Sequence, residues 1–254
     1  MASELVVLPD ADALADEAAD RFVTAAALAI EARGRFVVAL AGGETPRGAY
    51  QRLAAEPRRS RVAWSRVVVL WGDERCVPPD ARGSNYRMVR EALLDHVAVR
   101  QENVHRIHGE EDPATAAARY EATLRGVLGT PAGPPRAGAG TGIDLVILGL
   151  GTDGHTASLF PGSAASREQT RWAVAEYAPA VAMWRISLTT GVINAAADVT
   201  FIVSGSAKAE ILARVRGPAP AGAALPAQLI TPSDGRLRWL VDAAAAARLE
   251  RTPS

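Results

Sequence analysis

Four short apolar runs constrain the fold of this chain more than any other feature of its sequence. They are rich in β-branched residues and lie at residues 36–41, 67–71, 143–148 and 199–203. Each run is apolar on both faces, and its polar residues are limited to Asp144 and Thr200. A strand with one side facing solvent instead alternates apolar and polar residues. The runs therefore predict strands that are buried on both faces of a parallel sheet.

The segments between these runs are rich in Ala, Leu and Arg, a composition typical of helices. We expect helices near residues 10–33, 46–55, 84–95, 113–128 and 206–215. Parallel strands need crossover connections, and helices usually provide them. Strands that alternate with helices form βαβ units with right-handed crossovers, so the pattern predicts a layered α/β fold.

Two stretches, at 129–142 and 217–224, are rich in Gly, Pro and Ala and poor in large apolar side chains. Such segments bury too little apolar surface to offset the entropy of ordering, so we expect flexible surface loops there. We interpret 129–142 as a loop inside one domain rather than as a domain boundary. Residues 1–254 are accordingly expected to form a single α/β domain.

Charge and apolar content argue against several classes of partner. The chain has 28 basic and 28 acidic residues, so bulk electrostatics gives no support to binding of duplex DNA or of an anionic membrane. No apolar run approaches the roughly 20 residues that span a bilayer. The N-terminus lacks the basic and apolar regions of a secretory signal. We therefore expect a cytoplasmic protein with no nucleic-acid and no membrane partner.

The chain has a single cysteine, Cys76. One cysteine excludes an internal disulfide and a thiolate metal cluster, and it fits a reducing compartment. Cys76 follows an acidic pair and could be reactive, but a lone thiol is more often a small buried hydrophobe. We expect the packed thiol.

The first chemically interesting loop comprises residues 41–46 and follows a predicted buried strand. Gly42 and Gly43 allow backbone N–H groups to approach an anion closely, and a helix N-terminus there adds a favourable partial charge. Thr45 is expected to cap that helix, and Pro46 fits its first turn. By itself the loop is equally compatible with a plain turn that needs glycine for its geometry alone.

Two further strand ends carry cations. Asp73, Glu74 and Arg75 follow the strand at 67–71, and Arg75 could hold phosphate oxygens in a bidentate manner. The alternative is a solvated charge cluster on a surface turn. Lys208 is predicted in the first turn of a helix, where the helix dipole does not favour a cation, so we expect it to reach an anion at the sheet edge. The alternative there is an ordinary exposed lysine.

The loop at 149–156 has the spacing G-x-G-x-x-G, which is typical of dinucleotide-binding turns. We reject that interpretation because Asp153 would place a carboxylate beside the pyrophosphate. His155, expected at the start of a helix, instead resembles a positioned general base, since imidazole suits proton transfer at neutral pH. The alternative is a histidine that only packs or caps.

Taken together, these loops resemble the family of 6-phosphogluconolactonases and glucosamine-6-phosphate isomerases. The resemblance runs from about residue 20 to about residue 245 and keeps the order of the motifs throughout. The matching segments are LAGGETP, WGDER with SNY, LGLGTDGHTASLFPG, RISLT with Asn194, and VSGSAKAEIL.

The resemblance implies a Rossmann-like, doubly wound, mainly parallel sheet flanked by helices. It also implies hydrolysis of 6-phospho-D-glucono-1,5-lactone to 6-phospho-D-gluconate in the oxidative pentose phosphate pathway, with no metal and no organic cofactor. The partner is then a small sugar-phosphate lactone, and we expect a monomer or a weak homodimer. The implied catalytic residues are His155 as general base, Asp73 and Asp153; the implied substrate- and phosphate-binding residues are Gly42, Gly43, Thr45, Arg75 and Lys208.

Two other functions compete with this expectation. The resembling isomerases carry a carboxylate five residues after the histidine to assist ring opening, and here that position is Phe160. A non-catalytic sugar-phosphate sensor would normally add a basic DNA-binding helix pair. The N-terminal helix predicted at 10–33 is instead rich in acidic residues near its start. Hydrolysis therefore remains the preferred prediction.

Overall fold

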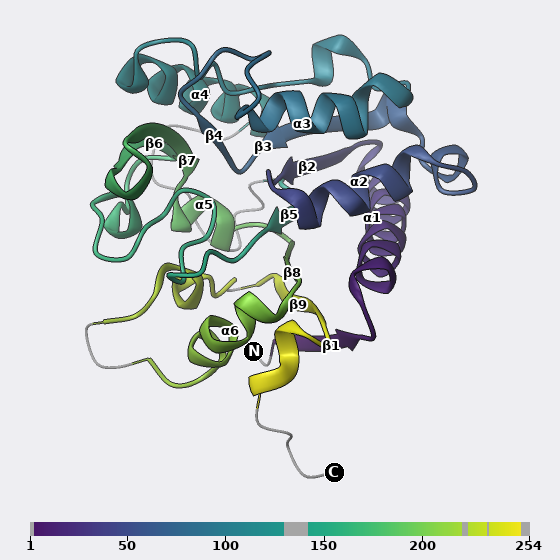
Figure 1. Ribbon diagram of the computed structural model, residues 1–254. Coiled ribbons are helices and arrows are strands. Elements are labelled where there is room, and N and C mark those ends of the chain that lie inside the picture. Colours follow the sequence, from purple (N-terminus) through teal and green to yellow (C-terminus); the bar gives the residue numbers. More distant parts are fainter. Residues whose placement is uncertain (1–2, 130–141, 220–222, 233, 250–254) are drawn as a thin grey trace.

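The computed structural model describes residues 3–129, 142–219, 223–232 and 234–249. At its centre lies a six-stranded sheet whose neighbouring strands are all parallel, in the order β1-β9-β8-β5-β2-β3 (Figure 1). This confirms the predicted mainly parallel α/β fold. The strands are β1 (Glu4–Leu8), β2 (Phe36–Leu40), β3 (Val67–Trp71), β5 (Leu145–Leu148), β8 (Asp198–Val203) and β9 (Arg236–Asp242).

The four predicted strands are β2, β3, β5 and β8, and they lie side by side in this sheet. Every residue in them is buried, as expected for strands covered on both faces. β1 and β9 were not predicted. β1 lies at the edge of the sheet and is mostly exposed, and β9 has Arg236 and Arg238 in its first half, so neither strand is buried along its whole length as the four predicted strands are.

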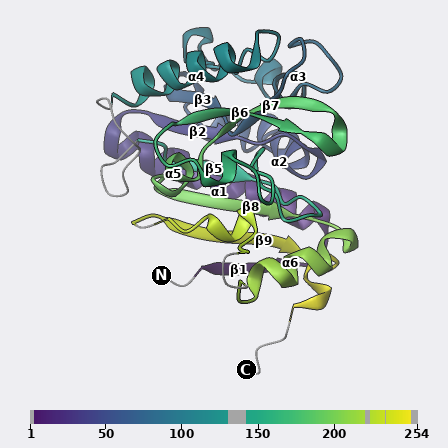
Figure 2. The same ribbon diagram turned by 90° about the vertical axis from the view of Figure 1, so that its left-hand side faces the viewer.

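The helices are α1 (Ala11–Arg33), α2 (Glu44–Ala54), α3 (Asn85–Ala92), α4 (Pro113–Leu128), α5 (Thr190–Asn194) and α6 (Ala209–Arg216). The five predicted helices are confirmed to within a few residues at each end, and α5 was not predicted. α1 and α2 lie on one face of the central sheet, and α5 and α6 lie on the other (Figures 1 and 2). The sheet is thus the middle layer of three.

Local chemistry defines both ends of α1. The Asp10 side chain accepts a hydrogen bond from the Ala13 N–H at 2.8 Å, and Gly34 ends the helix in the left-handed conformation, at φ 73°. Between these ends, Phe22 packs edge-to-face on Phe36 of β2, with ring centroids 5.2 Å apart. The buried face of the helix is thereby fixed against the sheet.

A second, three-stranded antiparallel sheet was not predicted. It has the order β4-β7-β6 and comprises β4 (Asp73–Arg75), β6 (Ala173–Ala178) and β7 (Met183–Leu188). β4 has three residues, all charged, and from the sequence it resembled a loop. In Figure 2 the β6–β7 hairpin lies in front of the central sheet, on the side of α5 and α6.

The order of the central strands places a topological switch between β2 and β5. From β2 the chain continues outward to β3, whereas from β5 it continues in the opposite direction to β8 and β9. The loops that follow β2 and β5 therefore diverge and leave a crevice at the carboxyl ends of the strands. In open α/β sheets ligands bind at this position.

Three other predictions concern the chain as a whole. The flexible loop predicted at 129–142 falls mainly on residues 130–141, which lie outside the described residues. Cys76 packs against the core as a partly buried free thiol, and burial together with the nearby Glu74 raises its pKa to about 11. In the described parts of the chain, no helix is both long and apolar enough to cross a membrane.

Candidate active site

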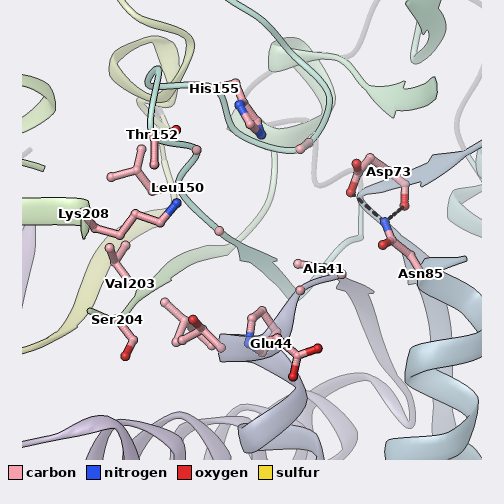
Figure 3. Close-up of a pocket in the computed structure, with 18 of the residues that line it drawn as sticks. Ala41, Glu44, Asp73, Asn85, Leu150, Thr152, His155, Val203, Ser204 and Lys208 are labelled. Atoms are coloured by element: carbon pink, nitrogen blue, oxygen red, sulfur yellow. Dashed lines mark hydrogen bonds between the residues drawn. The ribbon is translucent and has the colours of Figure 1, made fainter. Parts of the chain in front are cut away.

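A cavity of about 380 Å³ opens at the carboxyl ends of β2, β5 and β8 (Figure 3). All four loops singled out in the sequence contribute to its walls. Of the predicted site residues, it is lined by Gly42, Gly43, Thr45, Asp73, Arg75, His155 and Lys208. Asp153 is the one predicted site residue that does not line it, and it contacts His155 instead.

The first wall is the turn between β2 and α2. Gly43 is the N-cap of α2, with φ 106° and ψ 162°, and no side chain caps this end of the helix. The expectation that Thr45 caps α2 is therefore wrong: the helix begins at Glu44, because Gly43 adopts a conformation that other residues rarely take. A Cβ atom on Gly42 would lie 1.8 Å from Asn85 Oδ1, so only glycine fits there.

His155 lies in the loop after β5, where its ring is held by Asp153. His155 Nδ1 is 2.6 Å from Asp153 Oδ1, and the same oxygen accepts the His155 backbone N–H at 3.1 Å. With Nδ1–H donating to the carboxylate, Nε2 remains as the proton acceptor. Burial alone would raise the pKa of Asp153, but the hydrogen bonds and charge of His155 lower it.

The His155 loop differs from the expectation in one respect. Residues 149–164 form turns, and no helix begins at His155, so the predicted helix start is wrong. Pro161 and Gly162, which follow closely, disfavour a helix there. A dinucleotide-binding turn requires a helix after its glycines, so this finding supports rejection of that motif.

Two contacts restrict the His155 ring further. A Cβ atom on Gly151 would lie 2.1 Å from His155 Nδ1, so the backbone approaches the imidazole closely. The Phe160 ring packs against the imidazole with centroids 4.9 Å apart. The ring is thus confined by a carboxylate, a glycine backbone and an aromatic face.

Asp73 is 7% exposed and occupies the first position of β4. Its Oδ2 accepts a 2.6 Å hydrogen bond from the Ser158 hydroxyl, and its Oδ1 accepts a 3.2 Å hydrogen bond from Asn85 Nδ2. Ser158 and Asn85 were present in the motifs, but no role was assigned to either. These two hydrogen bonds hold the carboxylate of Asp73 at the cavity wall, and Figure 3 shows the one from Asn85.

Glu74 is a structural anchor rather than a substrate contact. Its buried carboxylate accepts the backbone N–H groups of Arg75, Asn85 and Tyr86. Burial raises the pKa of Glu74, and these hydrogen bonds oppose that effect. Glu74 thereby ties the end of β4 to the N-terminus of α3.

Lys208 extends into the cavity from the 3₁₀ turn Ser206–Lys208, directly before α6 (Figure 3). Burial lowers the pKa of Lys208, while the charge of Asp153 acts in the opposite direction. Asp242, at the end of β9, accepts hydrogen bonds from the Ser204 hydroxyl and the Gly205 N–H and so positions this loop. The structure thus places Lys208 at the sheet edge, as predicted.

Two arginines complete the wall on the side of the second sheet. Arg75 lies on β4, and its Nη1 donates a 2.6 Å hydrogen bond to the Gly83 carbonyl. Arg185, on β7, also lines the cavity and was not predicted as a site residue. Within the described residues, no cluster of three or more His, Cys, Asp and Glu side chains could hold a metal ion.

Known proteins match this chain over most of its length. A family model described as glucosamine-6-phosphate isomerases/6-phosphogluconolactonase matches residues 9–239. A protein named 6-phosphogluconolactonase from Nostoc sp. is 39% identical over 250 residues, which cover 98% of this chain and 99% of the relative. These matches confirm the resemblance predicted from the motifs.

Solved structures agree with these matches. A 6-phosphogluconolactonase from Trypanosoma cruzi superposes with a TM-score of 0.85 at 27% identity, and the match covers 98% of each chain. A monomeric glucosamine-6-phosphate deaminase superposes with a TM-score of 0.76 at 20% identity, covering 96% of this chain and 99% of the other. At that identity the deaminase shares the fold alone.

Proposed function

Because this chain belongs to the family of glucosamine-6-phosphate isomerases and 6-phosphogluconolactonases, we propose that it hydrolyses 6-phospho-D-glucono-1,5-lactone to 6-phospho-D-gluconate. This is the lactone-opening step of the oxidative pentose phosphate pathway. One observation carries the choice of reaction. Asp153 orients the His155 imidazole so that its Nε2 can accept a proton, and the ring that packs against this imidazole is Phe160 rather than a second acid.

The phosphate is best accommodated between the glycine turn and Lys208. Gly42 and Gly43 lead into the N-terminus of α2, where backbone N–H groups and the helix dipole favour an anion. Lys208 adds a half-buried positive charge to the same cavity. Thr45 and Arg75 are proposed as further substrate contacts.

The chemistry then needs one base and no cofactor. His155 Nε2 accepts a proton from water, and the resulting hydroxide oxygen bonds to the C1 carbonyl carbon. As the tetrahedral intermediate collapses, the bond between C1 and the ring oxygen breaks, and the imidazolium returns the proton to that oxygen. A positioned base of this kind contributes on the order of 10²–10⁴ in rate. Asp153 keeps the imidazole in the required tautomer, and Asp73 is proposed to bind a sugar hydroxyl.

The isomerase alternative requires a proton relay for opening a stable hemiacetal ring. Phe160 occupies the position where the resembling isomerases have a carboxylate, and a phenyl ring cannot carry a proton. A lactone carbonyl is already an electrophile and needs no such relay. We therefore expect no ammonia release from glucosamine 6-phosphate.

The sensor alternative is not supported by the N-terminal helix. Asp16 and Asp20 on α1 form ion pairs with Arg58, so the acidic residues there hold α1 against the segment after α2. A DNA-binding helix would instead present basic side chains that neutralise phosphates.

The decisive assay measures loss of the phosphorylated lactone, generated in place by glucose-6-phosphate dehydrogenase and corrected for spontaneous hydrolysis. We expect the purified protein to accelerate hydrolysis well above the uncatalysed background. Glucosamine 6-phosphate, assayed in parallel by ammonia release, should not react. Deamination without lactonase activity would overturn the proposal.

A further inference from the structure

Arg75 and Arg185 are direct partners across the antiparallel β4–β7 ladder. Side chains at directly opposed positions lie on the same face of a sheet, and like charges placed so are destabilising. Both arginines also line the cavity. Two like charges at this spacing disfavour folding, so their presence in the cavity indicates a role in binding.

The protein neutralises neither guanidinium directly. Among the described residues, neither arginine forms an ion pair with a carboxylate, and the Nε atoms of both are buried without a hydrogen-bond partner. Asp73 is near enough to favour the charged form of Arg185, but its oxygens already accept hydrogen bonds from Ser158 and Asn85. Burial in turn lowers the pKa of Arg185. Buried donors without partners are costly, so this part of the cavity favours an incoming anion.

The position of Arg75 and Arg185 in the cavity indicates contact with the reacting carbon rather than with the phosphate. The Arg185 guanidinium carbon lies 6.0 Å from the centre of the Phe160 ring, the same ring that packs against His155. Lys208 and Asp73 lie on opposite sides of the cavity (Figure 3), and Asp73 shares strand β4 with Arg75. The cavity therefore has two cationic ends, with the proposed base between them.

We propose that Arg185, together with Arg75, forms a second anion subsite that holds the C1 oxygen of the lactone and then the carboxylate of the product. This inference rests on the proposed lactonase function. Planar guanidinium groups match the two oxygens of a carboxylate, whereas the helix N-terminus and Lys208 suit a phosphate dianion. In the tetrahedral intermediate the same donors face the oxyanion, where stabilisation accelerates the reaction.

Ligands that differ at C1 alone can test this assignment. 6-Phosphogluconate carries both a phosphate and a carboxylate, whereas glucitol 6-phosphate has a hydroxymethyl group in place of the carboxylate. Calorimetry should show that Arg185→Met weakens binding of 6-phosphogluconate by about tenfold or more, as expected for the loss of a charge-assisted contact. Binding of glucitol 6-phosphate should change by less than about twofold. Lys208→Met should weaken binding of both ligands.

Turnover provides a second, independent measurement. Arg185→Met should lower kcat by on the order of 10², the effect of losing an oxyanion donor, with a small change in KM. The factor should be the same for the phosphorylated lactone and for plain glucono-1,5-lactone. Arg185→Lys should recover only part of the rate, since an ammonium lacks the planar donor pair. Arg61→Met, which removes an exposed cation on the surface after α2, is the matched control and should behave like the wild type.

Each alternative role for Arg185 has its own outcome. Equal loss of affinity for both ligands would make Arg185 a phosphate ligand and overturn the subsite. Unchanged binding and turnover in a folded Arg185→Met protein would make it a counter-charge for Asp73 and overturn the subsite as well. A wild-type protein that binds neither ligand and hydrolyses no lactone would overturn the proposed function itself. Because the wild type is measured first, that failure is distinguishable from the other two.

Discussion

His155 is the residue on which the proposed reaction depends most. His155→Ala should lower kcat by on the order of 10² or more, because the water loses its proton acceptor. The wild-type rate should also fall at acid pH, since a protonated imidazole accepts no further proton. Steady-state lactonase kinetics across a pH series measures both effects.

The matched control is His96→Ala, which removes an exposed histidine from the short turn after α3. It should retain wild-type turnover. Near-normal turnover of a folded His155→Ala protein would remove this imidazole from the mechanism.

Lys208 is expected to act on the phosphate alone. Lys208→Met should raise KM for the phosphorylated lactone strongly, because it removes a half-buried cation at the anion-binding end of the cavity. The penalty should shrink for plain glucono-1,5-lactone, which has no phosphate to bind. Equal losses on both lactones, measured as kcat/KM, would contradict the assignment.

Strand β4 and helix α3 depend on each other through one carboxylate. Glu74 accepts backbone N–H groups from both elements, and it is 2% exposed. Glu74→Ala should lower the free energy of unfolding by about 1–3 kcal/mol, because buried N–H donors lose their acceptor. It should also lower activity, since the backbone of Arg75 and Asn85 is held by these contacts and Asn85 in turn positions Asp73. Urea unfolding measures the first effect.

Glu44→Ala is the comparison for this variant, because the Glu44 side chain is 86% exposed and forms one ion pair on the protein surface. Its unfolding midpoint should remain near that of the wild type. A Glu74→Ala protein as stable as the wild type would show that α3 does not need this anchor.

The whole molecule should lose stability in acid. Several carboxyl groups have a lowered pKa in the folded protein; hydrogen bonds from Arg106 hold that of Glu110 at about 2, and backbone N–H groups do the same for Glu168. A carboxyl group whose pKa is lower in the folded than in the unfolded protein stabilises the fold at any pH above its unfolded pKa. This stabilisation is lost as the pH falls towards the folded pKa. We therefore expect the urea midpoint to fall between about pH 4.5 and pH 2.

The contribution of Glu74 to stability has the opposite sign, because burial raises its pKa in the folded protein. The folded state therefore binds a proton at Glu74 more tightly than the unfolded state does, which favours folding as the pH falls. This contribution should offset only part of the decline, as one group against several. Glu110→Gln should make the decline shallower than in the wild type. A midpoint that stays constant from pH 5 to pH 2.5 would contradict the expectation.

The central strands could be predicted because burial on both faces leaves a local mark on the sequence. β2, β3 and β5 are apolar at every position, and β8 is apolar at all positions except Asp198 and Thr200. No contact partner has to be known for that pattern to be recognised. The β6–β7 hairpin carries polar and exposed residues among its apolar ones, so its strands depend on pairing rather than on pattern.

The candidate site divides in the same way. The glycine turn, the His155 loop and the Lys208 loop each follow a recognisable strand, and the carboxyl ends of parallel strands meet at one sheet edge. Their convergence on one cavity was therefore predictable. Two local details were predicted wrongly, the capping of α2 by Thr45 and the helix start at His155. Gly43 and Pro161 decide them through backbone geometry at single positions.

Amino-acid order alone determined which chemical groups each strand end presents, since neighbours along the chain stay neighbours in the fold. Only tertiary structure decided which distant groups face one another. Asp73 accepts a hydrogen bond from Ser158, which is 85 residues away in the sequence. Arg75 lies opposite Arg185 because β4 and β7 pair in one particular register. A shift of one residue would turn the Arg185 side chain to the other face of its strand. Strand register is set by packing across the whole hairpin, which no local segment of the sequence encodes.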